Sequence, residues 1–183
     1  MRRGILAGAL AFAVLAAMPL PGAVGAQPFR DPRRGGVGEG IRAGAERFSV
    51  VFKASKTDGC GFAERAEVTV GGVDWVFSDG AEVSVTNARI NITNLETGTS
   101  YLQTSTYHRT ITTRADGTQL WVIDGSRWMD FREGEPGPYG TVGPGGHEYF
   151  VSGLQTIVVD PKKETILSYS VSGQVLDACV ILA

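Results

Sequence analysis

Histidine and cysteine are scarce in this chain of 183 residues, which contains two of each. A catalytic zinc site usually draws on several histidines, cysteines and carboxylates at fixed spacing. His108 and His147 are far apart in the sequence, and Glu148 would point to the opposite face of a strand from its neighbour His147. The sequence therefore predicts no metal site, and it contains no pattern that predicts another cofactor.

The motifs of nucleophilic and phosphate chemistry are also missing. The sequence has no Gly-x-Ser-x-Gly elbow, no P-loop and no dinucleotide-binding glycine loop. The glycine-rich run GPGGHE precedes an expected strand, so it offers no helix N-terminus to an anion. Acid–base chemistry has three candidates, His108, Asp124 and Asp130. We expect the two aspartates to flank a turn at Gly125-Ser126, where turn capping explains them more simply than catalysis does.

The first 26 residues have the three parts of an export signal. Arg2 and Arg3 form a positive segment, residues 4–18 are apolar and uncharged, and Val24-Gly25-Ala26 offers small residues at a cleavage site. An apolar run of about 15 residues is short of the roughly 20 that cross a bilayer. We therefore predict cleavage after Ala26, a secreted or cell-envelope protein, and no membrane span after cleavage. The arginine pair leaves both the general and the twin-arginine export routes open.

Basic residues are few in the expected mature chain. Cleavage would remove two arginines and no acidic residue, which leaves 15 of the 17 Lys and Arg against 19 Asp and Glu. The one basic cluster, RDPRR at 30–34, lies in a segment that we expect to be flexible. Binding to nucleic acid requires a basic surface, so the sequence predicts no nucleic-acid partner.

The rest of the chain divides at residue 45. Residues 27–45 are rich in glycine, proline and arginine and have almost no apolar periodicity, which predicts a flexible arm. Residues 46–183 follow the period of two that is typical of strands, and they predict a single all-β domain. We expect eight strands with short connections and no helix, at about 46–53, 68–77, 83–92, 101–114, 120–124, 127–131, 148–160 and 165–182.

Several positions predict irregular strands. Gly71-Gly72 and Gly173 indicate a bulge or bend. Val83 and Val85 alternate on odd numbers while Ile90 and Ile92 alternate on even numbers, which predicts a bulge near Thr86-Asn87. In the long threonine-rich strand we expect the face of Thr104, Thr106, His108 and Thr110 to point outward. Eight sequential strands favour an antiparallel up-and-down barrel, and a two-sheet β-sandwich is the alternative.

The chain ends on the apolar run DACVILA, which contains one of its two cysteines. Two cysteines in an exported chain predict a disulfide between Cys60 and Cys179. In the chain-entropy model, closing so long a loop contributes roughly 4–5 kcal/mol to stability. We expect the terminal segment to be a strand that this bond prevents from fraying.

Four segments carry a resemblance to known sequences: TNLETG, ADGT, VDPKKETILSYSVSG and VLDACVILA, at 93–98, 115–118, 159–173 and 175–183. With the surrounding strands they resemble a set of uncharacterised exported proteins of high-GC Gram-positive bacteria. The resemblance covers about two thirds of the expected mature chain. It implies a small exported β domain closed by a disulfide, and it implies no activity, cofactor or catalytic residue.

Residues 132–146, REGEPGPYGTVGPGG, form an unusually long glycine- and proline-rich loop, and loops of this kind are often functional or disordered. Aromatic residues are dense around it. They are either core residues or the lining of an apolar ligand site that the loop covers. The ligand-binding candidates are Tyr107, Trp121, Trp128, Phe131, Tyr139 and Tyr149.

These observations support three functional hypotheses. The first is a secreted β-barrel module that binds a small or apolar molecule and has no catalytic residues. The second is a structural or protein-interaction domain of the cell envelope, with an envelope protein as its partner. The third and least favoured is a small-barrel isomerase or cyclase that uses His108, Asp124 or Asp130 as its base.

Overall fold

The computed structural model describes the backbone of residues 24–30, 37–54 and 59–183, and the side chains of residues 45–54 and 59–183. The expected export signal therefore lies almost entirely outside the described residues. Within the described part of the chain, no helix is long and apolar enough to cross a membrane.

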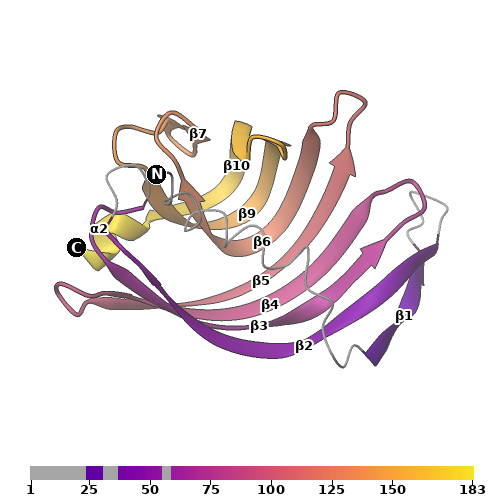
Figure 1. Cartoon of the computed structure of the whole chain (residues 1–183), viewed down its shortest axis with the longest axis horizontal. Coiled ribbons are helices and arrows are strands. Elements are labelled where there is room, and N and C mark those ends of the chain that lie inside the picture. Colours follow the sequence, from indigo (N-terminus) through magenta and orange to yellow (C-terminus); the bar gives the residue numbers. More distant parts are fainter. Residues whose placement is uncertain (1–23, 31–36, 55–58) are drawn as a thin grey trace, which may run out of the picture.

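Eight strands form one antiparallel sheet in the order β1-β2-β3-β4-β5-β6-β9-β10, and the sheet curls strongly on itself (Figure 1). Two short strands, β7 and β8, form a separate hairpin. The strands are β1 (Val24–Arg30), β2 (Val37–Phe52), β3 (Glu64–Val76), β4 (Glu82–Asn94), β5 (Ser100–Thr113), β6 (Gln119–Phe131), β7 (Pro136–Gly137), β8 (Gly140–Thr141), β9 (His147–Asp160) and β10 (Thr165–Asp177).

The all-β prediction is confirmed. Among the described strands, the pairs form one continuous sheet, and none of them joins β1 to β10. The described strands therefore do not close into a barrel. The strands of this sheet follow one another as neighbours along the chain, apart from the insertion of the β7–β8 hairpin between β6 and β9.

The predicted arm at residues 27–45 differs from the structure, which places Val24–Arg30 and Val37–Phe52 in paired strands. The cause is the length of β3, which continues through Gly71-Gly72 to Val76 and pairs with β2 as far as Glu39. Backbone pairing satisfies N–H and C=O groups whatever the side-chain pattern, so a segment without apolar periodicity can still form a strand. The predicted irregularity at Gly71-Gly72 is present in the partner strand, where the register shifts between Ala43 and Glu46.

Strand β4 has no bulge, contrary to the prediction near Thr86-Asn87. Its register with β3 and β5 is continuous, and its buried side chains alternate on even numbers throughout. Ser84 and Thr86 therefore face inward, while Val83 and Val85 face outward. The prediction failed because it assumed that apolar residues mark the inner face, whereas this part of the inner face is polar. In β5 the outward orientation of Thr104, Thr106 and His108 is confirmed by their exposure.

Gly125-Ser126 is not a turn, because Gln119–Phe131 is a single strand. Gly125, Gly153 and Gly173 lie side by side in β6, β9 and β10, and this glycine row bends the sheet. Gly125 and Gly153 have φ angles of 128° and 109°. A Cβ atom at any of the three would collide with a carbonyl oxygen of the neighbouring strand, so the bend requires glycine at each position.

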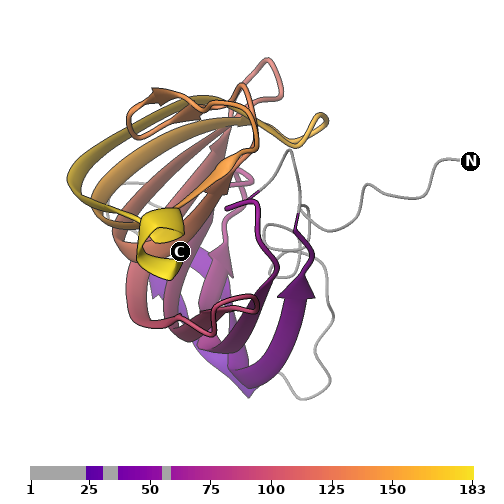
Figure 2. The ribbon, with the colours of Figure 1, turned by 90° about the vertical axis from the view of Figure 1, so that its left-hand side faces the viewer.

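The chain ends in a short helix, α2 (Ala178–Leu182), rather than in the predicted strand. Asp177 ends β10 and caps this helix, since its Oδ1 accepts a hydrogen bond of 3.0 Å from the backbone N–H of Val180. The helix contacts β9 and β5 and lies at one end of the curled sheet (Figures 1 and 2). At the other end of the helix, the Asn94 side-chain amide donates 2.9 Å to the backbone oxygen of Leu182.

The glycine row and the curl create two hydrophobic cores. The first lies on the inner face of β5, β6, β9 and β10 and contains Ile123, Met129 and Ile157. Beyond the point where β5 and β6 stop pairing, at Tyr107 and Gly125, the opposite face of β6 and β9 packs against β2–β5. This second core contains Ile92 and Phe150 together with Leu182 of α2. Both faces of β6 and β9 are therefore packed against other parts of the protein.

Candidate functional site

The six aromatic candidates occupy three different environments. Four of them belong to the first core, where at most 8% of each side chain is exposed: Tyr107, Trp121, Phe131 and Tyr149. Trp128 lies in the second core, on the other face of β6. Tyr139 is 72% exposed, and its ring meets that of Tyr149 at 5.7 Å between centroids. The structure therefore brings four of the six together, in a packed core.

The long loop at residues 132–146 covers one end of this core as an ordered hairpin. Glu135 is buried and fixes the loop, because one carboxylate oxygen accepts from the backbone N–H of Arg132 at 2.8 Å and the other from that of Ile166 at 2.9 Å. Val142 packs into the core from the loop. The loop is thus tied to β10, and it encloses the first core.

The inner face of the sheet also carries a group of polar side chains, which we call the inner polar cluster. It comprises Ser84 and Thr86 of β4, Gln103, Ser105, Tyr107 and Arg109 of β5, Arg127 of β6, Gln155 of β9 and Tyr169 of β10. The strand register places these residues on one face of the sheet. Ser84 is opposite Arg109, and the pairing of β5 with β6, of β6 with β9 and of β9 with β10 keeps the other residues on the same face. The glycine row crosses the same face, and there the backbones of β5, β6, β9 and β10 approach one another closely.

Few polar contacts hold the inner polar cluster together. Arg109 donates from Nη2 to Ser84 Oγ at 3.1 Å, and Tyr169 donates from its hydroxyl to Gln155 Oε1 at 3.2 Å. The guanidinium carbon of Arg127 lies 5.5 Å from the centre of the Tyr107 ring. That of Arg109 lies at the same distance from the Trp121 ring. Two arginines therefore rest on two aromatic rings of the first core.

Five buried atoms of the cluster have no hydrogen-bond partner among the described residues: Gln103 Oε1, Ser105 Oγ, Arg109 Nε, Arg127 Nη1 and Gln155 Nε2. Burial lowers the pKa of the Arg127 guanidinium, and the nearby charge of Arg109 lowers it further. Burial also raises the pKa of the Tyr169 phenol. The cluster is therefore a partly buried, positively charged region with unused hydrogen-bonding capacity.

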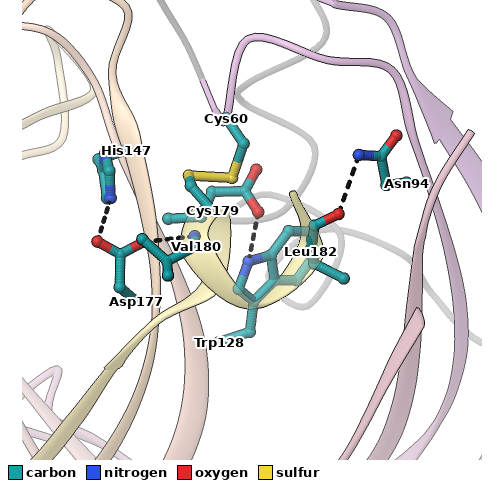
Figure 3. The surroundings of a disulfide bond; sticks show 9 residues. Cys60, Asn94, Trp128, His147, Asp177, Cys179, Val180 and Leu182 are labelled. Atoms are coloured by element: carbon teal, nitrogen blue, oxygen red, sulfur yellow. Dashed lines mark hydrogen bonds and ion pairs between the residues drawn. A yellow bond between two sulfur atoms is a disulfide. The ribbon is translucent and has the colours of Figure 1, made fainter. Parts of the chain in front are cut away.

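A second group of ionisable residues lies beside the disulfide, where β3 and β9 face each other across the second core. Glu64 and Glu148 are 1% and 4% exposed, and their carboxylate oxygens and the sulfur of Cys60 all lie within 4.8 Å of one another. Trp128 donates from its indole N–H to Glu148 Oε2 at 2.9 Å. Figure 3 shows the disulfide with Trp128, and also the contacts of Asp177 with His147 and of Asn94 with Leu182. We call Glu64 and Glu148 the acid pair.

The acid pair holds protons more tightly than isolated carboxyl groups do. Burial raises the pKa of Glu64 from 4.5 to about 7 and the nearby charge of Asp130 raises it further, while the proximity of Glu148 lowers it. Burial, followed by the charges of Glu64 and Asp130, raises the pKa of Glu148 well above its usual range. One proton shared between two carboxyl groups is the arrangement that like charges at close range favour. Because its cysteine is in the disulfide, the group of Cys60 with the acid pair offers only two metal ligands.

The three acid–base candidates from the sequence do not form one site. His108 and Asp124 are opposite each other on β5 and β6, and both are exposed on the outer face. Asp130 lies in the same strand as Asp124 instead of across a turn, and it interacts with the acid pair. The structure therefore separates the pair of aspartates that the predicted turn would have brought together.

A cleft of about 180 Å³ opens where β5 and β6 stop pairing. Its lining mixes polar and apolar side chains, and it comprises Tyr101, Leu102, Gln103, Thr104, Ser126, Phe150, Val151, Ser152, Gln174 and Leu176. Gln103 is the one residue of the inner polar cluster that reaches this lining. The cleft is small and shallow compared with typical ligand pockets of 300–1,000 Å³.

The predicted disulfide is present between Cys60 and Cys179, with an S–S distance of 2.07 Å. Comparison of the chain with family models, with curated proteins and with solved structures found no match. The functional argument therefore rests on the residues and geometry described above.

Proposed function

We propose that this protein is an exported binding module that holds a small polar molecule against the inner polar cluster. The observation that carries the proposal is the set of five buried polar atoms without hydrogen-bond partners, which belong to side chains on one face of β5, β6 and β9. A buried polar group without a partner costs about 1–3 kcal/mol, and native proteins keep few of them. A bound molecule that supplies the missing partners would remove this cost.

The position of the cluster supports the same proposal. The donors and acceptors without partners come from three different strands, β5, β6 and β9, which share this face by register. In this proposal the curled sheet forms the wall of a barrel-like interior, with β1 and β10 at its edges. The disulfide and the export signal suit a protein that works outside the cytoplasm.

The ligand is proposed to be polar rather than apolar, which changes the expectation drawn from the aromatic residues. Tyr107, Trp121, Phe131 and Tyr149 are packed against one another and against the loop, so their apolar surface is already buried within the protein. The inner polar cluster, by contrast, retains unused donors and acceptors. The atoms that lack hydrogen-bond partners belong to polar side chains, so the ligand that binds them is expected to be polar.

The second candidate is a protein-interaction domain of the cell envelope. It is favoured by the outer face at the β5–β6 opening, where Leu102 is 47% exposed at the cleft. There the facing backbone edges of both strands pair with no other strand among the described residues. Such edges can accept an added strand. Leu102 is, however, surrounded by a polar surface that includes Thr104 and Thr106. We therefore favour small-molecule binding at the inner polar cluster over protein binding at this face.

Native mass spectrometry of the exported, disulfide-closed protein tests the proposal. We expect an added mass that activation removes. Ser105→Ala should reduce the liganded fraction while raising the stability of the unliganded protein by about 1 kcal/mol, because it removes an unpaired buried hydroxyl. Thr104→Val is the matched control, since Thr104 is the next residue and is exposed on the other face. A bare mass for the wild type, before and after incubation with small molecules from the culture, contradicts the proposal.

A further inference from the structure

The arginines of the inner polar cluster have no acidic partner among the described side chains. Arg109 forms a hydrogen bond to the neutral hydroxyl of Ser84, and Arg127 lies against the ring of Tyr107. The acidic residues that share this face by register are Glu46, Glu64, Asp74, Glu82 and Asp177, and none of them forms an ion pair with Arg109 or Arg127 among the described residues. The ionisable groups that act most strongly on Arg127 are two tyrosines and Arg109.

A guanidinium group stays protonated in proteins, so burial does not remove this charge. Two like charges that lie near each other and are partly removed from water destabilise the folded protein unless an anion compensates them. The aromatic rings beneath both arginines offset part of the cost through cation–π contacts. They do not satisfy the N–H groups, of which Arg109 Nε and Arg127 Nη1 remain unpaired.

The unpaired atoms of the cluster also specify the chemistry of the missing partner. Three of the five are N–H donors, on Arg109, Arg127 and Gln155, and the hydroxyl of Ser105 can donate as well. Gln103 Oε1 is the one atom that can only accept. The complementary group is therefore rich in acceptor oxygens, and a guanidinium fork matches the oxygens of a carboxylate or a phosphate.

We infer that the ligand is a small organic anion whose carboxylate or phosphate group binds between Arg109 and Arg127. This inference rests on the proposed function and gives its ligand a charge and a binding group. The charge of the ligand explains why the chain keeps two arginines on an inner face where neutral polar residues would cost less.

The first experiment uses the intact, disulfide-closed protein with defined probes. Thermal unfolding is followed with inorganic phosphate, acetate and benzoate at constant ionic strength, with chloride as the reference ion. We expect phosphate or the carboxylates to raise the Tm in a saturable way. Phosphate acting alone would identify a phosphate ligand, and the carboxylates acting alone would identify a carboxylate. Shifts equal to those in chloride would overturn the inference.

Arg127→Gln and Arg109→Gln should each weaken anion binding about tenfold to a hundredfold, because each removes a charged hydrogen-bond donor. Arg89→Gln is the matched control, since it removes the same charge from an exposed position on β4. Arg127→Lys keeps the charge without the planar fork, and it should bind better than Arg127→Gln and less well than the wild type. Should Arg127→Gln not fold, Arg109→Gln and Arg127→Lys carry the test.

The native mass spectra and the Tm values together distinguish a failure of the anion inference from a failure of the proposed binding function. An added mass in the native spectrum that survives in both Arg→Gln variants would leave a binding module and overturn the anion. An added mass that disappears in both variants, but stays in Arg89→Gln, would support both. A bare wild-type protein whose Tm does not respond to any probe would overturn the proposed function and the anion together.

Discussion

At the scale of single residues, the acid pair makes the stability of this protein depend on pH. The pKa of Glu64 is about 7 in the folded protein and that of Glu148 lies well above its usual 4.5, so the folded state binds more protons than the unfolded state between these values. Stability should therefore be fully present below about pH 4.5 and decrease as the pH rises through 7 and beyond. We expect a loss on the order of 2–3 kcal/mol between pH 5 and pH 8 from Glu64 alone.

Urea unfolding at pH 5 and pH 8 measures this loss, and Glu148→Gln should make it smaller. The glutamine can accept the indole N–H of Trp128 and donate to Glu64, while it carries no charge. Glu133→Gln, at an exposed position of the loop, is the control. Equal pH dependence in Glu148→Gln and the wild type would show that the acid pair does not govern the effect.

Trp128 is the residue whose role the structure changes most. The sequence made it a ligand-binding candidate, but its ring packs edge-on against Phe52 at 5.7 Å and its N–H bonds Glu148. Trp128→Ala should lower the free energy of unfolding by about 3 kcal/mol, because it opens a cavity and leaves Glu148 with one donor fewer. Tyr139→Ala, at an exposed ring of the loop, should change it by less than about 1 kcal/mol. A stable Trp128→Ala that loses an added mass would instead restore the ligand role.

At the scale of elements, the glycine row bends β6, β9 and β10 together. Gly153→Ala should cost more than about 3 kcal/mol, because alanine there adds a collision with the Ser172 carbonyl to the strain of a positive φ. Gly98→Ala is the matched control, since Gly98 has a φ of 79° with open space around it, and it should cost about 1 kcal/mol. Equal denaturation midpoints for the two variants would show that the row does not need to be free of side chains.

The strands were predictable from the sequence where one face is apolar, and so were the irregularities at Gly71-Gly72 and Gly173. The predictions at Thr86-Asn87 and Gly125-Ser126 were wrong. Alternation located β3, β4, β5, β9 and most of β10, and the two cysteines gave the disulfide. The same rule predicted a bulge in β4, because it treats Val83 and Val85 as inward while Ser84 and Thr86 are the buried residues. It also read Gly125 as a turn, since glycine in a row across three strands is visible only once the register is known.

The candidate site escaped prediction for the same physical reason. Arg109 and Arg127 are 18 positions apart in the sequence, and each lies among residues that give no strand a clean apolar face. Their proximity depends on the pairing of β5 with β6. Aromatic density was a misleading signal, because in this protein the rings support the arginines from within a packed core.

At the scale of the whole molecule, the disulfide joins the end of the chain to the loop before β3 across 119 residues. The bond holds α2 at one end of the curled sheet, above the acid pair. Replacing both cysteines by serine should lower the free energy of unfolding at pH 5 by roughly 4 kcal/mol in the chain-entropy model, as measured by urea unfolding. An effect below 1 kcal/mol would show that the packing of Leu182 and the Asn94 contact hold the helix without the bond.

The same variant tests whether the disulfide is what keeps the acid pair dry. Glu148 lies near this bond, because its Oε1 is close to Gly59 and one of its carboxylate oxygens is within 4.8 Å of the sulfur of Cys60. If loosening the loop and α2 admits water, desolvation of the pair weakens and its pKa values move back towards 4.5. We then expect the loss of stability between pH 5 and pH 8 to be smaller in the double serine variant than in the wild type. An unchanged loss would mean that β3, β6 and β9 alone bury the pair, and that the bond fixes the chain end without shaping its electrostatics.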